Sequence, residues 1–98
     1  MRFQLTHSDG PAVTIRPSER FDFSCAGELR ETSSSLGPDV TLTVDFSGTS
    51  YVDSAALGML LLLGEKNGGT RRVRLTNAKG QPKEALEQAN FNRLFQME

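Results

Sequence analysis

Apolar and polar residues alternate over several short stretches of the chain, and this period of two predicts β-strands. The alternation is clearest over residues 40–46, VTLTVDF, where the valines, leucine and phenylalanine share one face and the threonines share the other with Asp45. The turn sequence SDGP, at 8–11, separates two shorter stretches that are expected to form a hairpin-like pair. The shorter stretches with the same pattern lie at residues 3–5, 13–15, 20–25 and 71–75.

A helical period fills the gaps between these strands. Helices are predicted over residues 26–35 and 54–67, which are followed by a Gly-Pro pair and a Gly-Gly pair that stop a helix. A third helix begins near Pro82, because proline suits the first helical turn. The tail, FNRLFQM, is expected to form a short last helix that packs Phe91, Leu94 and Phe95.

The order of these elements predicts the fold. Strands alternate with helices through the C-terminal two-thirds of the chain, which favours parallel strands joined by right-handed crossovers. The strands alternate in polarity instead of being apolar throughout, so one face of the sheet should be solvated and the helices should cover mainly the other. We therefore predict an α/β fold: a single small two-layer domain over residues 1–98, with a mixed β-sheet and helices packed mainly on one face.

The helix that begins at residue 54 has two different faces. At about 100° per residue, its apolar core face consists of Ala56, Met59, Leu60 and Leu63. Packing on a sheet buries one stripe of a helix, so leucines on the other face stay partly exposed. Either neighbouring loops cover them, or they form a protein-binding surface that the glycine lets a partner approach closely. This second face carries Ser54, Gly58, Leu61, Leu62 and Glu65.

Asp53 and Ser54 stand where this helix begins. A side-chain oxygen at such a position typically accepts a hydrogen bond from an orphan backbone amide and so caps the helix. A catalytic serine is disfavoured, because the chain has no G-x-S-x-G sequence and its only histidine, His7, lies in the first strand or its turn. The residues alone therefore favour a capping role.

Composition excludes several other functions. Eleven basic and twelve acidic residues nearly balance, which argues against nucleic acid as a partner. One cysteine and one histidine allow neither an intrachain disulfide nor a convincing zinc site, so no metal or cofactor is predicted. The pattern turns Phe21, Phe23 and Cys25 inward, and a reactive thiol is the minor alternative for Cys25. The leucine run is shorter than a membrane span and the N-terminus lacks a signal-peptide core, so we expect a soluble cytoplasmic protein with no membrane partner.

One segment, TLTVDFSGTSYVDSAALGMLLLL at residues 41–63, resembles the core of the STAS family, in particular the bacterial anti-sigma-factor antagonists. The family pattern is a hydrophobic strand ending in Asp, a loop, and then Asp-Ser-(Ser/Thr/Ala)-Gly-Leu-Gly opening a long apolar helix. Here that motif is DSAALG at 53–58. RFDFSCAGELRE resembles the family's strand and first helix, and VRLTNAKGQPKEALEQANFNRLFQM resembles its last strand and C-terminal helices. The likeness covers nearly the whole chain from about residue 13.

The resemblance implies a partner-switching protein without catalytic residues of its own. In this family the unmodified protein binds an anti-sigma factor, often a serine kinase with a GHKL-type ATP site, and binding frees the sigma factor. The kinase phosphorylates the motif serine, here Ser54, and the complex dissociates until a PP2C-type phosphatase restores the binding form. The partner-binding surface is then expected to consist of Asp53, Ser54, Gly58, Leu61, Leu62 and Glu65.

The motif departs from the family pattern at the position of its first glycine, and its third position lacks the hydroxyl group that other members can carry there. Ala56 replaces the usual glycine on the core face, where a methyl group favours the helix, and Ala55 replaces a second hydroxyl residue. Ser54 is consequently the only phosphoacceptor at the motif. Asp53 either orients the serine hydroxyl for the kinase or caps the helix, and both roles stay open.

Other polar residues are predicted to support this loop. Asp22 and Asp45 lie at strand positions from which they are expected to brace the loop or to be solvated. Ser47, Thr49 and Ser50 precede the motif and are expected to shape the loop.

Two further functions remain as alternatives. The chain could be a constitutive STAS adaptor that binds another signalling enzyme or a larger assembly without turnover at Ser54. It could instead be a small ligand-binding or hydrolytic protein that uses the Ser54 region as an anion site. The last alternative is the weakest, because Asp53 adjoins the helix end and no glycine-rich phosphate cradle is present.

Overall fold

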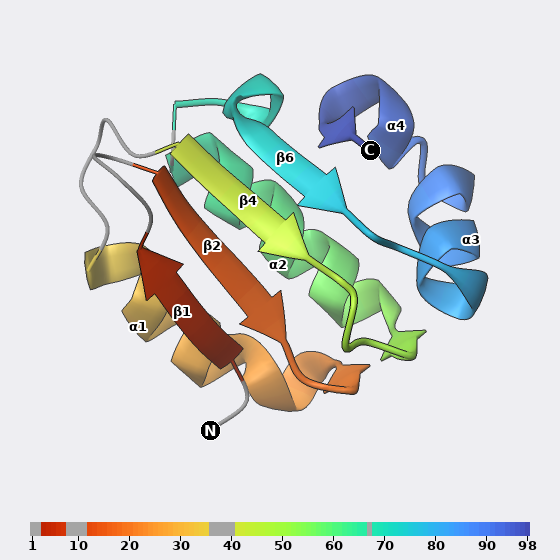
Figure 1. Ribbon diagram of the computed structural model, residues 1–98, viewed down its shortest axis with the longest axis horizontal. Helices are drawn as coiled ribbons and strands as arrows, with labels where there is room; N and C mark the ends of the chain where they lie inside the picture. Colours follow the sequence, from red (N-terminus) through yellow and green to blue (C-terminus); the bar gives the residue numbers. More distant parts are fainter. Residues whose placement is uncertain (1–2, 8–11, 36–40, 67) are drawn as a thin grey trace.

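The computed structural model describes residues 3–7, 12–35, 41–66 and 68–98. Its main sheet has five strands in the order β1-β2-β4-β6-β7 (Figure 1). β1 pairs with β2 in antiparallel fashion and the other neighbouring pairs are parallel, which confirms the predicted mixed sheet. The turn expected between β1 and β2 lies outside the described residues. The strands are β1 (Phe3–His7), β2 (Ala12–Pro17), β4 (Thr41–Asp45), β6 (Val73–Thr76) and β7 (Gln96–Met97).

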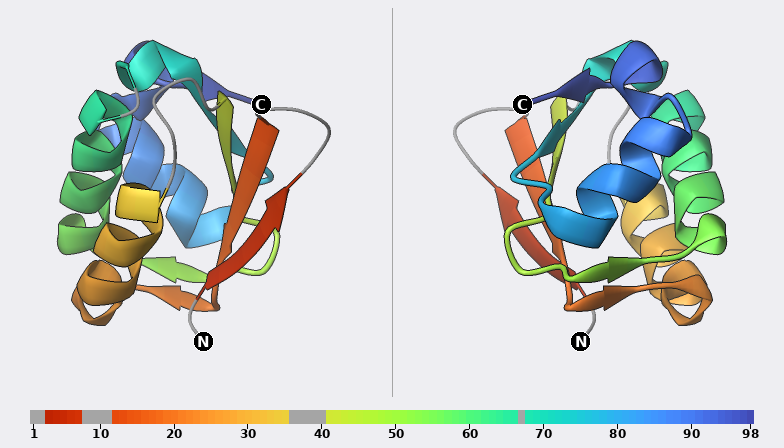
Figure 2. Two further views of the ribbon diagram at one scale, coloured as in Figure 1. Left: turned by 90° about the vertical axis from the view of Figure 1, so that its left-hand side faces the viewer. Right: turned by 90° about the vertical axis from the view of Figure 1, so that its right-hand side faces the viewer.

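The helices lie on one side of this sheet, as views from two opposite sides show (Figure 2). α1 (Ala26–Ser35) and α2 (Ser54–Lys66) pack against each other. α3 (Gly80–Gln88) follows β6, and α4 (Phe91–Leu94) leads directly into β7. The two-layer arrangement with helices on one face is therefore confirmed, and within the described residues no helix has the length and apolar character that crossing a bilayer requires.

Apolar side chains from both layers fill the space between sheet and helices. β4 contributes Leu42 and Val44, and α2 contributes Ala56, Leu60 and Leu63, all of them buried. Removing each large aliphatic side chain of this kind from water stabilises the fold by about 1.5–3 kcal/mol. The predicted core face of α2 is thus correct, although Met59 at its margin is only partly buried.

Gly64 lets the last turns of α2 pack closely against the chain that follows. A Cβ atom at this position would lie 2.8 Å from Thr70 Cγ2 and 3.3 Å from the Phe95 ring. Only glycine fits there without displacing its neighbours. The residue therefore fixes the C-terminal half of α2 against η2 (Thr70–Arg72) and the end of the chain.

The stretch predicted as a strand over 20–25 is a strand for two residues only. β3 (Arg20–Phe21) pairs in parallel with β5 (Tyr51–Val52) in a second, two-stranded sheet. The Asp22 carboxylate then accepts a hydrogen bond from the Ser24 amide, which starts the 3-10 turn η1 (Phe23–Cys25). Because η1 breaks the alternation, Phe21 and Cys25 are buried but Phe23 is 71% exposed, and its predicted inward position is wrong.

The C-terminal tail also differs in part from the prediction. α4 ends at Leu94, and the residues after it form β7, an edge strand that the helical pattern did not predict. Phe91 and Phe95 are buried, with ring centroids 5.0 Å apart, whereas Leu94 is exposed. The backbone at Phe95 is extended, which ends the helix and brings β7 alongside β6.

Candidate functional site

Ser54 is the first residue of α2, and its side chain is exposed. The capping group of this helix is Asp53, whose Oδ1 accepts the Ala56 amide at 2.8 Å. Asp53 Oδ2 accepts the Phe23 amide at 3.3 Å. Both carboxylate oxygens thus hold backbone amides, so the geometry supports the capping interpretation of Asp53 over one in which it orients the serine.

The loop before Ser54 is held at several points. The Thr49 hydroxyl lies 3.0 Å from the Ser18 carbonyl oxygen and is buried. The amides of Ser50 and Tyr51 both donate to the Glu19 carbonyl, at 2.8 and 3.1 Å. Thr49 and Ser50 therefore shape the loop through contacts with the segment that follows β2.

Gln81 from α3 also holds this loop. Its Oε1 accepts the Val52 amide and its Nε2 donates to the Val52 carbonyl, each at 2.8 Å. This double hydrogen bond ties β5 to α3 two residues before Ser54. This contact was not predicted, because a single glutamine at the start of a helix has no distinctive pattern.

Asp45 closes the other end of the loop, where β4 stops. Its carboxylate accepts hydrogen bonds from Arg16, from the Asn77 amide group and from the Ser47 backbone amide, at 3.0, 2.9 and 2.9 Å. Burial alone raises the pKa of Asp45, but the bonds from Asn77, Ser47 and Arg16 outweigh it and lower the pKa to about 2. Asp45 is therefore a charged brace for the loop, in line with one of the two roles predicted for it.

Asp22 braces the neighbouring turn. The Ser24 hydroxyl and amide both donate to its carboxylate, and the Arg20 side chain lies 3.5 Å away. Hydrogen bonds from Ser24 hold the pKa of Asp22 below its ordinary value. The position of η1 beside Asp53 follows from this turn.

The outer face of α2 carries four of the predicted partner-binding residues. Ser54, Gly58, Leu62 and Glu65 are all exposed, and Leu62 retains 60% of its accessible surface. Leu61 differs from them, because it is partly buried and packs against the hydrophobic core. A Cβ atom built on Gly58 meets nothing within 4 Å, so the fold itself does not require glycine there.

A wide, shallow groove runs beside Ser54, between the start of α2 and α3. The start of α2 forms one wall with Asp53, Ser54 and Leu57. The other wall belongs to α3, which was not predicted to be part of the site. It consists of Gln81, Ala85 and Gln88, together with Ala89 directly after the helix.

Phe23 adds apolar surface on the other side of the helix end. Its backbone amide is bonded to Asp53, which precedes Ser54, and its ring is exposed. Phe23 was not predicted to be part of the site, because the alternation over residues 20–25 predicted a strand with Phe23 turned inward. The Asp-x-Ser sequence around it, typical of a capped turn, was the available signal.

The described residues hold no group of three or more His, Cys, Asp and Glu side chains able to bind a metal ion. Cys25 is buried, with its sulfur 3.6 Å from the Arg20 carbonyl oxygen. It is an interior side chain, as predicted. The site around Ser54 therefore consists of the serine hydroxyl group, the backbone amides that Asp53 caps, and the exposed apolar surface nearby.

Residues 5–96 match the protein-family model described as Mlab, STAS domain. A STAS-domain containing protein of Pseudomonas aeruginosa (strain UCBPP-PA14) is 34% identical over 95 residues, which cover 95% of this chain and 94% of that protein. Similarity therefore extends over nearly the full length of both chains.

Several solved structures share the fold. The anti-sigma factor antagonist SpoIIAA in its unphosphorylated form has a TM-score of 0.72 at 21% identity, covering 98% of this chain and 86% of that one. SpoIIAA of Bacillus in its phosphorylated form has a TM-score of 0.73 at 19% identity, covering 98% of this chain and 90% of that one. A putative anti-sigma factor antagonist from Thermotoga maritima has a TM-score of 0.81 at 16% identity, covering 97% of this chain and 84% of that one.

Proposed function

This chain belongs to the STAS-domain family, and on that premise we propose that it is an anti-sigma-factor antagonist controlled at Ser54. The unphosphorylated form binds an anti-sigma factor that is also a GHKL-type serine kinase, and the sigma factor is released. Phosphorylation of Ser54 ends the complex, and a PP2C-type phosphatase restores it. The protein acts in the cytoplasm by binding alone, without catalytic residues, cofactor, nucleic acid or membrane contact.

The position of Ser54 is the observation that carries this proposal. Its side chain is exposed at the tip of α2, in line with the exposed Gly58 and Leu62. Asp53 caps the helix in its place, so the serine hydroxyl is not needed for the fold. A kinase can therefore reach it, and a partner seated on α2 would cover it.

The electrostatics of the helix end fit a switch without refolding. A phosphate on Ser54 adds about −1.5 to −2 charges. The partial positive charge at a helix N-terminus favours such an anion, so the fold itself tolerates modification. The SpoIIAA fold is known in both forms, and this chain resembles the two about equally.

Loss of binding then arises at the interface. A docked partner that covers the outer face of α2 would have to desolvate the phosphate beside the Asp53 carboxylate. A hundredfold loss of affinity requires only about 2.7 kcal/mol. One badly placed dianion supplies that amount.

Comparison of wild type with Ser54→Ala and Ser54→Asp tests the proposal. Each protein is immobilised and exposed to a bacterial lysate. Wild type and Ser54→Ala should retain an ATP-binding protein. Ser54→Asp should retain at least about tenfold less of it, since a carboxylate reproduces part of a phosphate's charge. With ATP, the captured protein should add one phosphate to wild type at Ser54 and none to Ser54→Ala, as measured by mass spectrometry. Failure to modify Ser54 would contradict the proposal.

The family model favours keeping one second candidate. It bears the description Mlab, STAS domain, which names a STAS protein without reference to sigma factors or phosphorylation. A constitutive adaptor would use the same exposed face of α2 but would bind its partner regardless of Ser54. Equal retention of one partner by all three baits would identify this function.

A further inference from the structure

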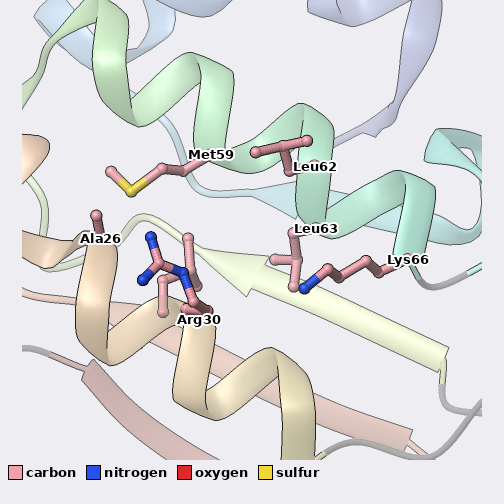
Figure 3. A pocket seen from close by; sticks show the side chains of 7 residues that line it. Ala26, Arg30, Met59, Leu62, Leu63 and Lys66 are labelled. Carbon is pink, nitrogen blue, oxygen red and sulfur yellow. The ribbon is translucent and has the colours of Figure 1, made fainter.

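A second hollow lies on the flank of α2 away from the Ser54 groove, where α2 faces α1 (Figure 3). Its volume is about 90 Å³. Leu29 and Leu63 are buried at its base, and Met59 and Leu62 form its apolar rim. None of the contacts that hold the Ser54 loop involves this hollow.

Both charged residues at this hollow are cations. Figure 3 shows Arg30 on α1 and Lys66 on α2 with their nitrogen atoms turned toward the gap between the helices. Neither forms an ion pair with another described residue. The acidic residues of the two helices, Glu28, Glu31 and Glu65, do not line the hollow. An apolar pocket between two unpaired cations complements an apolar group flanked by negative charges.

The size of the hollow selects its occupant. An apolar protein cavity of about 150 Å³ holds a benzene ring. This hollow is smaller and open to solvent, and its volume matches one aliphatic side chain better than a whole lipid chain or a nucleotide base. A third helix laid along the groove presents side chains at i−4, i and i+4 on one face, which places charges on both sides of an apolar residue.

We infer that the groove between α1 and α2 is a docking site for an acidic amphipathic helix of a protein partner. The helix inserts one Leu or Met side chain between Met59 and Leu62 and sets carboxylates against Arg30 and Lys66. This surface goes beyond the Ser54 switch. Leu62 lies eight residues after Ser54, about 12 Å along the axis. That exceeds the Debye length of about 8 Å at physiological ionic strength, so the effect of a charge at Ser54 on this docking is largely screened.

Two synthetic peptides of about 15 residues, a length at which an isolated helix can form, provide the test. They share one central leucine and differ only in carrying Glu or Lys four residues to either side of it. Methyl NMR spectra of the wild-type protein report where they bind. The Glu peptide should shift the methyl signals of Met59, Leu62 and Leu63, and the Lys peptide should leave them unchanged.

Charge reversal separates this site from the Ser54 switch. The double variant Arg30→Glu/Lys66→Glu should bind the Glu peptide about tenfold more weakly and should gain affinity for the Lys peptide. Arg93→Glu, on the exposed surface of α4, is the matched control and should change neither affinity. Ser54→Asp should bind the Glu peptide as wild type does, whatever its effect on the kinase.

Three results would overturn the inference. The first is equal shifts of the methyl signals by both peptides, and the second is peptide-induced shifts at Leu57 and Ala85 of the Ser54 groove. The third concerns laurate, a single lipid chain: it would shift the Met59 and Leu62 methyl signals while the Glu peptide does not. Because Ser54→Asp is examined separately, a failure here leaves the proposed function intact, and a failure at Ser54 leaves this docking site intact.

Discussion

Two carboxylates hold the ends of the loop that presents Ser54. Asp45 binds Arg16 and Asn77 where β4 ends, and Asp53 binds the amides of Phe23 and Ala56 where α2 begins. Ser54 follows Asp53 and is exposed to solvent, and the hydrogen bonds that hold this loop do not use its hydroxyl group. Its position is therefore set by its neighbours, and it can be modified without loss of a contact that the fold needs.

Asp45→Asn is predicted to make stability less sensitive to acid. The pKa of Asp45 is about 2 in the folded protein against an ordinary 3.8, so its contribution is complete above the ordinary value and disappears as pH falls toward 2. The difference corresponds to about 2 kcal/mol. Urea unfolding at pH 6 and near pH 2 should show that wild type loses more stability than the variant. Equal losses would contradict the charged-brace role of Asp45.

Gly58 and Gly64 form a matched pair for separating binding from folding. Gly58→Ala meets open space and should stabilise the protein by about 0.5–1 kcal/mol through helix propensity, while the added methyl weakens partner binding. Gly64→Ala should destabilise it, because its methyl group meets Thr70 and Phe95. Thermal unfolding and partner retention measure both effects. A Gly58→Ala protein that binds its partner fully would remove Gly58 from the interface.

At the level of the element, α2 presents three surfaces from one apolar sequence. Leu60 and Leu63 face the core, Met59 and Lys66 border the groove toward α1, and Leu62 is exposed where that groove meets the outer face of the helix. A run of four leucines does not distinguish these directions by composition. The packing of α1 and the sheet against the helix decides which leucine is left outside.

Leu62→Glu tests the outward surface of α2. Leu62 is mostly exposed, so the substitution should change the melting temperature little but should reduce capture of the partner by at least about tenfold. Leu60→Glu is the control, since it buries a carboxylate in the core and should unfold the protein. A large loss of stability in Leu62→Glu would mean that this surface supports the fold. Leu61 is unsuitable for the experiment because it packs against the core.

For the whole molecule, the switch is predicted to operate without rearrangement. Phosphorylated protein should give an amide NMR spectrum in which shifts are confined to Ser54 and residues close to it, including Phe23 and Gln81. The core signals of β4 and β6 should stay in place, because the helix end accommodates the charge. Widespread shifts across the sheet would instead indicate a conformational mechanism.

Much of this architecture follows from local pattern, and the exceptions have physical causes. The alternation in β4 and the apolar stripe of α2 specified their elements because each has one buried face. The capped turn at Asp22 overrode the alternation after Phe21 and exposed Phe23. β7 has only two residues, which are too few to show the alternation of apolar and polar positions that identifies a strand.

Only those parts of the candidate site that are formed by adjacent residues could be predicted from the sequence. The motif around Ser54 identified the exposed serine and its capping aspartate from adjacent residues. Contacts between distant segments did not follow from it, since the Gln81–Val52 pair joins residues 29 apart and the α3 wall of the groove depends on tertiary packing. Long-range geometry of this kind has no signature in a single sequence.

The bond between Gln81 and Val52 has a consequence for self-association. A carboxamide has the same donor and acceptor as a peptide group, so Gln81 satisfies Val52 as a neighbouring strand would. The Tyr51 amide donates to Glu19, just before β3, and the Asp53 amide donates to Phe21 in β3, which leaves Val52 facing the opposite edge of the small sheet. An unpaired edge recruits strands from other molecules. By pairing with this edge, Gln81 protects the small sheet beside Ser54 against edge-to-edge aggregation.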